Sequence, residues 1–183
     1  MPISKKIAAY LSKGSWIRKL FEEGQAMRRD GTGLPVYDLS LGNPELEPPA
    51  EFSNALRRAA TDDSPGRHGY MSNAGYDETR SAVAASLAAD HGLPFTYHNV
   101  LMTVGAGGAV NTALKALLDP GEEVIVVAPF FVEYRFYVDN HGGSTVVVDS
   151  GKGFNLDVAA IEARITDRTR AVMITNQNNP TGV

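Results

Sequence analysis

The sequence predicts an α/β fold: a mostly parallel sheet with helices on both faces, preceded by a short N-terminal helical arm. Apolar, β-branched runs recur about every 22 residues in the second half of the chain, with helix-period segments between them. A glycine-rich turn, Gly105 to Gly108, separates the first of these runs from the helix that follows it. Strands that alternate with helices in this way are typical of a parallel sheet covered by helices.

The chain before residue 100 is predicted to be mainly helical. Trp16, Ile17, Leu20 and Phe21 stand at helical spacing and predict a helix over Ser15–Met27. This helix is expected to pack on its own protein or on a partner subunit; the alternative is a helix on a membrane surface, which the adjacent glutamates disfavour. The remaining predictions are a short strand over Val36–Leu41, helices over Ala50–Ala60 and Tyr76–Asp90, and a long polar loop over Thr61–Gly75.

The sheet is predicted from residue 100 onward. The expected strands are Val100–Val104, Val124–Ala128, Thr145–Val148 and Ala171–Thr175, each a β-branched apolar run bounded by turn residues. Helices are expected over Ala109–Leu118, Phe130–Asn140 and Leu156–Ile165, the last with Asp157 as its N-cap. In such sheets ligands gather beyond the carboxyl ends of the strands. Three segments are expected there: Gly105–Gly108, Pro129–Phe131 and Asn176–Gly182.

Composition excludes several classes of protein. The 183 residues are 43% hydrophobic and 21% charged, with a formal charge of -4, a pI of about 5.5 and no cysteine. We therefore expect no nucleic-acid partner, no disulfide and no thiolate metal site. The four histidines show no ligand spacing, so no metal is expected, and Glu122 with Glu123 is expected to be solvated charge. With neither a signal peptide nor an apolar run long enough to span a membrane, a cytoplasmic protein is expected.

The turn at Gly105 is a candidate phosphate site. Glycine permits close approach of the backbone to a ligand, and the first N–H groups of the following helix have no intrahelical acceptor. The positive end of the helix dipole lies behind those groups. A P-loop would require Gly-Lys-Ser/Thr here, and a dinucleotide fingerprint would require a small residue at Val110 and an acid after the next strand; the sequence has neither.

Five segments together resemble the class I/II aminotransferases, which are fold-type I pyridoxal phosphate enzymes. The tail Asn179-Pro180-Thr181-Gly182 resembles the family's Asn-Pro-Thr-Gly signature. Tyr70, Gly75, Thr79 and Arg80 resemble its Tyr-x4-Gly-x3-Leu-Arg pattern, with threonine in place of leucine. The turn at Gly105 resembles the family's phosphate cup. The strand end Pro129–Phe131 resembles the segment with its cofactor-stacking aromatic, and Leu41–Pro44 resembles the segment with its substrate-side glycine.

The resemblance implies a cofactor, a reaction and site residues. Pyridoxal 5′-phosphate would bind through Gly105, Ala106 and Gly107 at its phosphate, with the Ala106 and Gly107 N–H groups donating. Phe131 would lie on its ring, and Asn179 would donate to its phenolate oxygen. Tyr70 would reach the phosphate of a neighbouring subunit in a homodimer, and Gly42 would donate to the substrate carboxylate. The reaction implied is transfer of an amino group between an L-amino acid and a 2-keto acid.

The same resemblance implies an incomplete enzyme. Residues 1–45 would be the N-terminal arm and part of the small domain, and residues 46–183 the N-terminal half of the cofactor-binding large domain. The family's Schiff-base lysine follows the Asn-Pro-Thr-Gly segment, so no catalytic residue is assigned in this chain and the chain alone is expected to be inactive. The alternatives are another fold-type I enzyme, such as a carbon-sulfur lyase or decarboxylase, a non-catalytic truncated relative, or a nucleotide-binding domain.

Overall fold

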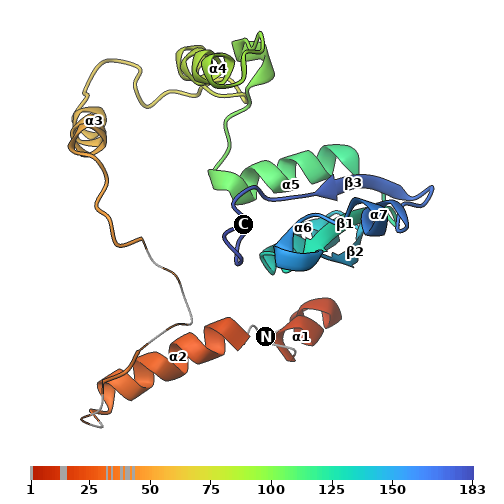
Figure 1. Cartoon of the computed structure of the whole chain (residues 1–183). Coiled ribbons are helices and arrows are strands. Elements are labelled where there is room, and N and C mark those ends of the chain that lie inside the picture. Colours follow the sequence, from red (N-terminus) through yellow and green to blue (C-terminus); the bar gives the residue numbers. More distant parts are fainter. Residues whose placement is uncertain are drawn as a thin grey trace. The chain divides into compact units, whose positions relative to one another are not determined.

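The computed structural model describes residues 2–12, 16–31, 33, 35–37, 39, 42 and 44–183. The chain divides into two compact units, Met1–His68 and Gly69–Val183 (Figure 1). The first unit contains the helices α1 (Lys5–Ser12), α2 (Trp16–Arg29) and α3 (Ala50–Ala60). Among the side chains that the structure describes, none of the buried hydrophobic ones belongs to this unit.

The first unit confirms two predicted helices and adds one. Helix α3 has the predicted bounds, and α2 extends two residues beyond the predicted end, to the basic pair Arg28 and Arg29, a favourable charge at a helix C-terminus. Helix α1 was not predicted from the sequence. Of the predicted strand Val36–Leu41, the described residues 36, 37 and 39 are in no strand, and residues 38, 40 and 41 lie outside the described part.

The second unit is an α/β domain with a parallel sheet. Its strands are β1 (Glu123–Ala128), β2 (Ser144–Asp149) and β3 (Thr169–Met173), in the order β2-β1-β3, and both pairings are parallel. Its helices are α4 (Asp77–His91), α5 (Gly105–Leu117), α6 (Glu133–Asn140) and α7 (Val158–Glu162), with short 3-10 turns η1 (Tyr97–Asn99) and η2 (Lys152–Phe154). The predicted fold class is confirmed.

Helices cover both faces of this sheet because of the strand order. The connection β1-α6-β2 runs across the sheet in one direction and the connection β2-α7-β3 in the other. Crossovers between parallel strands are right-handed, so α6 and α7 lie on opposite faces. One face carries the hydrophobic core, in which α5, β1 and α6 meet through five buried side chains, Leu114, Leu118, Val124, Val126 and Val138.

The predicted strand Val100–Val104 is wrong, and the helix after it begins earlier than expected. The Met102 N–H donates to Ala74 O (3.0 Å), and Val100 O accepts from Arg80 Nε (2.8 Å). These backbone groups are bonded to the segment around α4 rather than to a neighbouring strand, which is why a β-branched run forms no strand here. The glycines predicted as a separate turn, Gly105–Gly108, form the first turn of α5 itself.

Helix α7 confirms the predicted N-cap. The Asp157 carboxylate accepts a hydrogen bond from the Ala160 N–H at 2.9 Å, which satisfies one of the helix's unpaired N-terminal donors. The helix is shorter than predicted. It covers five residues of the expected Leu156–Ile165.

Candidate functional site

The first turn of α5 has the geometry of an anion-binding turn. Gly105 adopts a φ of +67°, a conformation that glycine adopts without strain. Its N–H donates to Thr103 O (3.1 Å), while the Thr103 hydroxyl donates to Gly105 O (3.1 Å), so the entry into the helix is fixed from both sides. Ala106 is exposed, and no atom lies within 4 Å of a Cβ built on Gly105. The space beside Gly105, at the positive end of the helix, is therefore open.

Helix α6 connects this turn to Phe131. A Cβ built on Gly107 would lie 3.1 Å from the hydroxyl oxygen of Tyr137 on α6. Tyr137 in turn lies beside Tyr134 (ring centroids 6.4 Å apart), and Tyr134 meets Phe131 edge to face (5.7 Å, 84°). Phe131 remains 37% exposed, so part of its ring is free to contact a ligand. The structure thus places two predicted site segments, 105–107 and 131, beside tyrosines of the same helix, α6.

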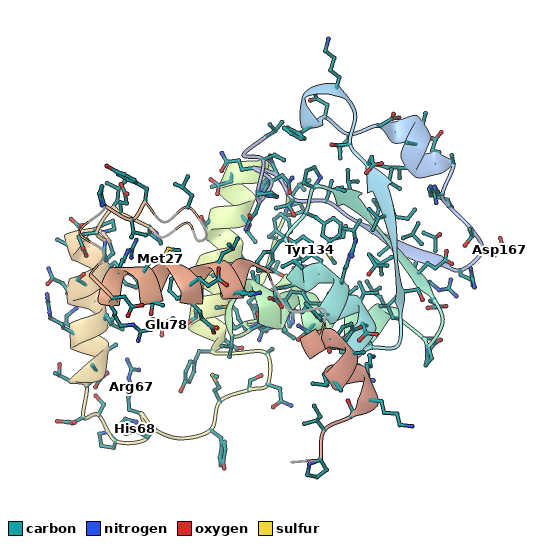
Figure 2. The ribbon with its side chains drawn as sticks, turned by 90° about the horizontal axis from the view of Figure 1, so that it is seen from below. Met27, Arg67, His68, Glu78, Tyr134 and Asp167 are labelled. Atoms are coloured by element: carbon teal, nitrogen blue, oxygen red, sulfur yellow. The ribbon has the colours of Figure 1, made fainter. Side chains whose placement is uncertain are left out.

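The loop after β3 lies against the end of β1. Asn178 Nδ2 donates to Pro129 O (2.8 Å) and to Thr181 Oγ1 (3.1 Å). The hydroxyls of Tyr134 and Thr175 share a hydrogen bond of 2.9 Å (Figure 2). Asn179 is exposed in this loop. The three segments that the sequence places at the carboxyl ends of the strands are therefore neighbours within the second unit.

Two predicted residues are not brought to this group. Tyr70 is fully exposed near the start of the second unit. Gly42 belongs to the first unit, and nothing lies within 4 Å of a Cβ built on it. Their roles remain predictions.

A cavity lies at the carboxyl ends of all three strands, the edge of the sheet where the sequence predicts that ligands gather. Its volume is about 380 Å³, and its lining includes Phe130, Tyr134, Leu156, Thr175 and Asn178. None of the seven predicted site residues lines it; Phe131 and Asn179 are sequence neighbours of residues that do. Tyr134 could have been found from the sequence, because it stands one helical turn after Phe131 and must share its face.

No group of three or more potential metal ligands was found in the described part of the chain. Nor does any helix in that part have the length and apolarity needed to cross a membrane.

The parallel sheet covered by helices is that of a truncated fold-type I transferase domain, and comparison with known proteins identifies the family. Residues 35–183 match the family Aminotransferase class I and II. The chain belongs to this family, whose members depend on pyridoxal phosphate.

Individual relatives agree with this assignment. A probable aspartate/prephenate aminotransferase of Thermus aquaticus is 38% identical over 159 residues, which are 86% of this chain and 40% of that protein. An aspartate aminotransferase of Streptomyces avermitilis is 31% identical over 99% of this chain and 44% of that protein. The crystal structure of an aminotransferase from Eubacterium rectale superposes with a TM-score of 0.89 at 37% identity, covering 98% of this chain and 46% of that one. The chain spans less than half the length of these relatives.

The residues present fit the phosphate end and ring of this cofactor. The first turn of α5 lies at the positive end of the helix, where N–H groups suit a phosphate, and the space beside Gly105 is open. The exposed part of the Phe131 ring is a flat apolar surface at the other end of the same aromatic row.

Proposed function

We propose that this chain is the N-terminal half of a pyridoxal phosphate-dependent aminotransferase that moves an amino group between an L-amino acid and a 2-keto acid. One observation carries the proposal: the open N-terminal turn of α5 is linked to the partly exposed Phe131 through Tyr137 and Tyr134. The named relatives act on aspartate and prephenate, and a similar solved structure is an alanine aminotransferase from Pyrococcus furiosus. We therefore propose the class of substrate and not one amino acid.

Each proposed residue has a role that its chemistry suits. The Ala106 and Gly107 N–H groups hold the phosphate, and Gly105 gives the backbone its entry angle. Phe131 fixes the tilt of the ring, and the Asn179 amide donates to the ring's phenolate oxygen. Gly42 offers its N–H to the substrate carboxylate, and Tyr70 reaches the phosphate bound by the partner subunit. When bound, the cofactor supplies an electron-withdrawing ring for cleavage of bonds at the substrate's α-carbon.

The proposal extends to organisation in the cell and in the assembly. Residues 1–45 form the arm and part of the small domain, and residues 46–183 form the N-terminal half of the large domain. The full-length enzyme is a cytoplasmic homodimer. These statements rest on the family resemblance and on Tyr70, whose complete exposure leaves it free to contact a second subunit.

The chain alone is proposed to lack transaminase activity. Its six lysines are Lys5, Lys6, Lys13, Lys19, Lys115 and Lys152, and none matches the family's Schiff-base position. Lys115 is the nearest of them in sequence to the phosphate turn, and it lies more than two turns into α5. The purified chain should show no turnover of amino acids with 2-oxoglutarate. Measurable turnover would contradict this part of the proposal.

Binding of the cofactor's phosphate is the direct test. Pyridoxamine 5′-phosphate is a suitable probe because it has no aldehyde and cannot form imines with surface lysines. Equilibrium dialysis of the full chain should show binding of pyridoxamine 5′-phosphate, and at least tenfold weaker binding of pyridoxamine, which lacks the charged group that the α5 turn recognises. Equal affinity for both compounds would contradict the assignment of the turn.

The ring contact is tested by Phe131→Ala. This variant should bind pyridoxamine 5′-phosphate about two- to tenfold more weakly, because one aromatic face is removed. Phe52→Ala, at an exposed phenylalanine on α3, is the matched control and should leave the affinity unchanged. Stabilisation of the chain against heat by a nucleotide, with none by pyridoxal phosphate, would favour the nucleotide-binding alternative instead.

A further inference from the structure

Three polar side chains hold the first turn of α5 against α6. Asn140, the last residue of α6, donates from Nδ2 to Asn111 Oδ1 (3.2 Å). Asn111 donates from its own Nδ2 to Gly107 O (2.9 Å). The hydroxyl of Tyr137 lies over Gly107. Asn111 and Tyr137 lie at the turn whose N–H groups are proposed to bind phosphate, and Asn140 reaches that turn through Asn111.

Two hydrogen bonds in sequence, which we call the asparagine relay, run from the Asn140 amide to Asn111 and from the Asn111 amide to the Gly107 carbonyl. Asparagine is a poor residue for a helix interior because its amide competes with the backbone for hydrogen bonds. Here the Asn111 amide uses its donor on a carbonyl in the first turn of its own helix and its acceptor on the end of α6. The relay therefore ties the Gly107 carbonyl to a second helix.

Tyr137 explains why residue 107 is glycine. The φ of Gly107 is not in the left-handed region, so its conformation does not require glycine. A Cβ at this position would lie 3.1 Å from the Tyr137 hydroxyl oxygen and 3.6 Å from the ring carbon that bears it. The first distance is too short for unstrained contact and the second is an ordinary one, so the hydroxyl alone makes the space tight.

We propose that Asn140, Asn111 and Tyr137 are positioning residues that clamp the first turn of α5 to α6 and so fix the Ala106 and Gly107 N–H groups for an anion. The ligand in this statement rests on the proposed function. The clamp itself is a property of the chain without ligand. Its role is mechanical, because these side chains act through the backbone of residues 105–107.

Hydrogen exchange measures the clamp without any ligand. In an α-helix the N–H groups of residues 109–111 bond to the carbonyls of residues 105–107, so opening of the first turn exposes them. In the full chain, Asn140→Ala should speed exchange at Ala109, Val110 and Asn111 about two- to tenfold, the effect of losing one side-chain hydrogen bond. The matched control is Asn54→Ala on α3, where Asn54 also makes one side-chain hydrogen bond, accepting it from Arg57 (2.9 Å). This control should leave exchange in α5 unchanged.

A double-mutant cycle tests Tyr137. Gly107→Ala should speed exchange in the first turn of α5 and weaken binding of pyridoxamine 5′-phosphate. Tyr137→Phe removes the crowding hydroxyl and should rescue part of both losses in the double variant. Tyr137→Phe alone should change the exchange rate and the affinity for pyridoxamine 5′-phosphate less than Gly107→Ala does.

The outcomes separate the clamp from the proposed function. If the wild-type chain does not bind pyridoxamine 5′-phosphate but the exchange effects appear, the proposed function is contradicted and the clamp is supported. Unchanged exchange in Asn140→Ala would overturn the asparagine relay. Additive effects of Gly107→Ala and Tyr137→Phe would overturn the part assigned to Tyr137.

Discussion

At the scale of single residues, Gly75 and Arg80 show why their motif has its residue types. Gly75 is buried and has a φ of +102°, and a Cβ there would lie 2.6 Å from Met102 Cγ and 2.8 Å from Met102 Cβ. Arg80 is 8% exposed, donates to Val100 O and Asp77 Oδ1, and lies 5.1 Å from the centroid of the Tyr97 ring. Thr79, where the family has leucine, is exposed, so the polar replacement costs no burial here.

We expect Gly75→Ala to lower the free energy of unfolding by roughly 2–5 kcal/mol, the sum of left-handed strain and overpacking. Gly121→Ala is the control, because Gly121 also has positive φ (+90°) but nothing lies within 4 Å of a Cβ built on it. The control should lose about 1–2 kcal/mol, from backbone strain alone. Urea denaturation followed by circular dichroism measures both, and equal losses would contradict the packing argument.

Arg80→Lys should destabilise the second unit by about 1–3 kcal/mol. Lysine cannot bond Val100 O and Asp77 at once in the geometry of the guanidinium fork, and one acceptor, part-buried in the case of Val100 O, is left without its donor. Arg164→Lys, at an exposed arginine, should change stability by less than about 0.5 kcal/mol. Urea denaturation measures the free energy of unfolding of both variants. A loss in Arg80→Lys as small as that in Arg164→Lys would show that the contacts of Arg80 contribute little to stability.

At the scale of elements, charged pairs join β1 to β3 at the amino-terminal ends of the strands. Glu123 is 6% exposed, forms a salt bridge with Arg168 and accepts from the Thr166 hydroxyl (2.8 Å). Glu122 forms a salt bridge with Arg170 and accepts from the Asp119 N–H (2.9 Å). The expectation that these glutamates are solvated charge is wrong. Their arginine partners are about 45 residues away along the chain, so local spacing could not predict the salt bridges.

The stability of these contacts should depend on pH. The Asp119 N–H, and after it the Arg170 guanidinium, hold the pKa of Glu122 below its ordinary value of 4.5, while partial burial opposes them. A carboxyl whose pKa is lowered by folding stabilises the folded state above the unfolded pKa, and this contribution is lost as pH falls through the folded pKa. The free energy of unfolding should therefore decrease on acidification below about pH 4.5.

Glu122→Gln should remove part of that decrease, because the amide does not titrate. Glu162→Gln, at an exposed residue of α7, serves as the control for loss of one charge. Denaturation curves at a series of pH values between neutral and pH 3 measure the slopes. The same acid slope in wild type and Glu122→Gln would contradict the assignment.

At the scale of the whole molecule, apolar surface is left without a partner in the part of the chain that the structure describes. Strand β3 pairs with β1 alone there, and Val172 and Ile174 are 43% and 61% exposed. In the first unit Leu20 and Met27 of α2 are both more than half exposed. Met27 is labelled on this helix in Figure 2. Parallel sheets in proteins are buried, and exposed strand edges promote association.

The purified chain alone should therefore associate with itself or with another chain. Light scattering coupled to size-exclusion chromatography should show species larger than the 19.6 kDa monomer. Val172→Lys, which places a charge on β3, should reduce this association. Lys152→Val, which removes a charge in η2 away from the strand, should not reduce it. A monodisperse wild-type monomer with a sharp thermal transition would contradict the prediction.

The sequence by itself determined the fold class, the positions of α3, α4, α6 and the three observed strands to within a few residues, the Asp157 cap and the family. These follow from local chemistry, because hydrophobic period, turn residues and short motifs are written in consecutive residues. The same reasoning identified the phosphate turn and Phe131 as candidates without any information about the distance between them.

The tertiary structure decided what depends on residues far apart in the chain. Val100–Val104 has the composition of a strand, but its backbone groups bond to Ala74 and Arg80, so it forms none. Other features also require a folded sheet and its helices. They are the salt bridges of Glu122 and Glu123, the cavity beside Phe130, the position of Tyr137 beside Gly107, and the hydrogen bond between Asn140 and Asn111. Local pattern predicts most of the elements, whereas contacts made only after folding decide whether a segment such as Val100–Val104 becomes a strand and which side chains meet at the site.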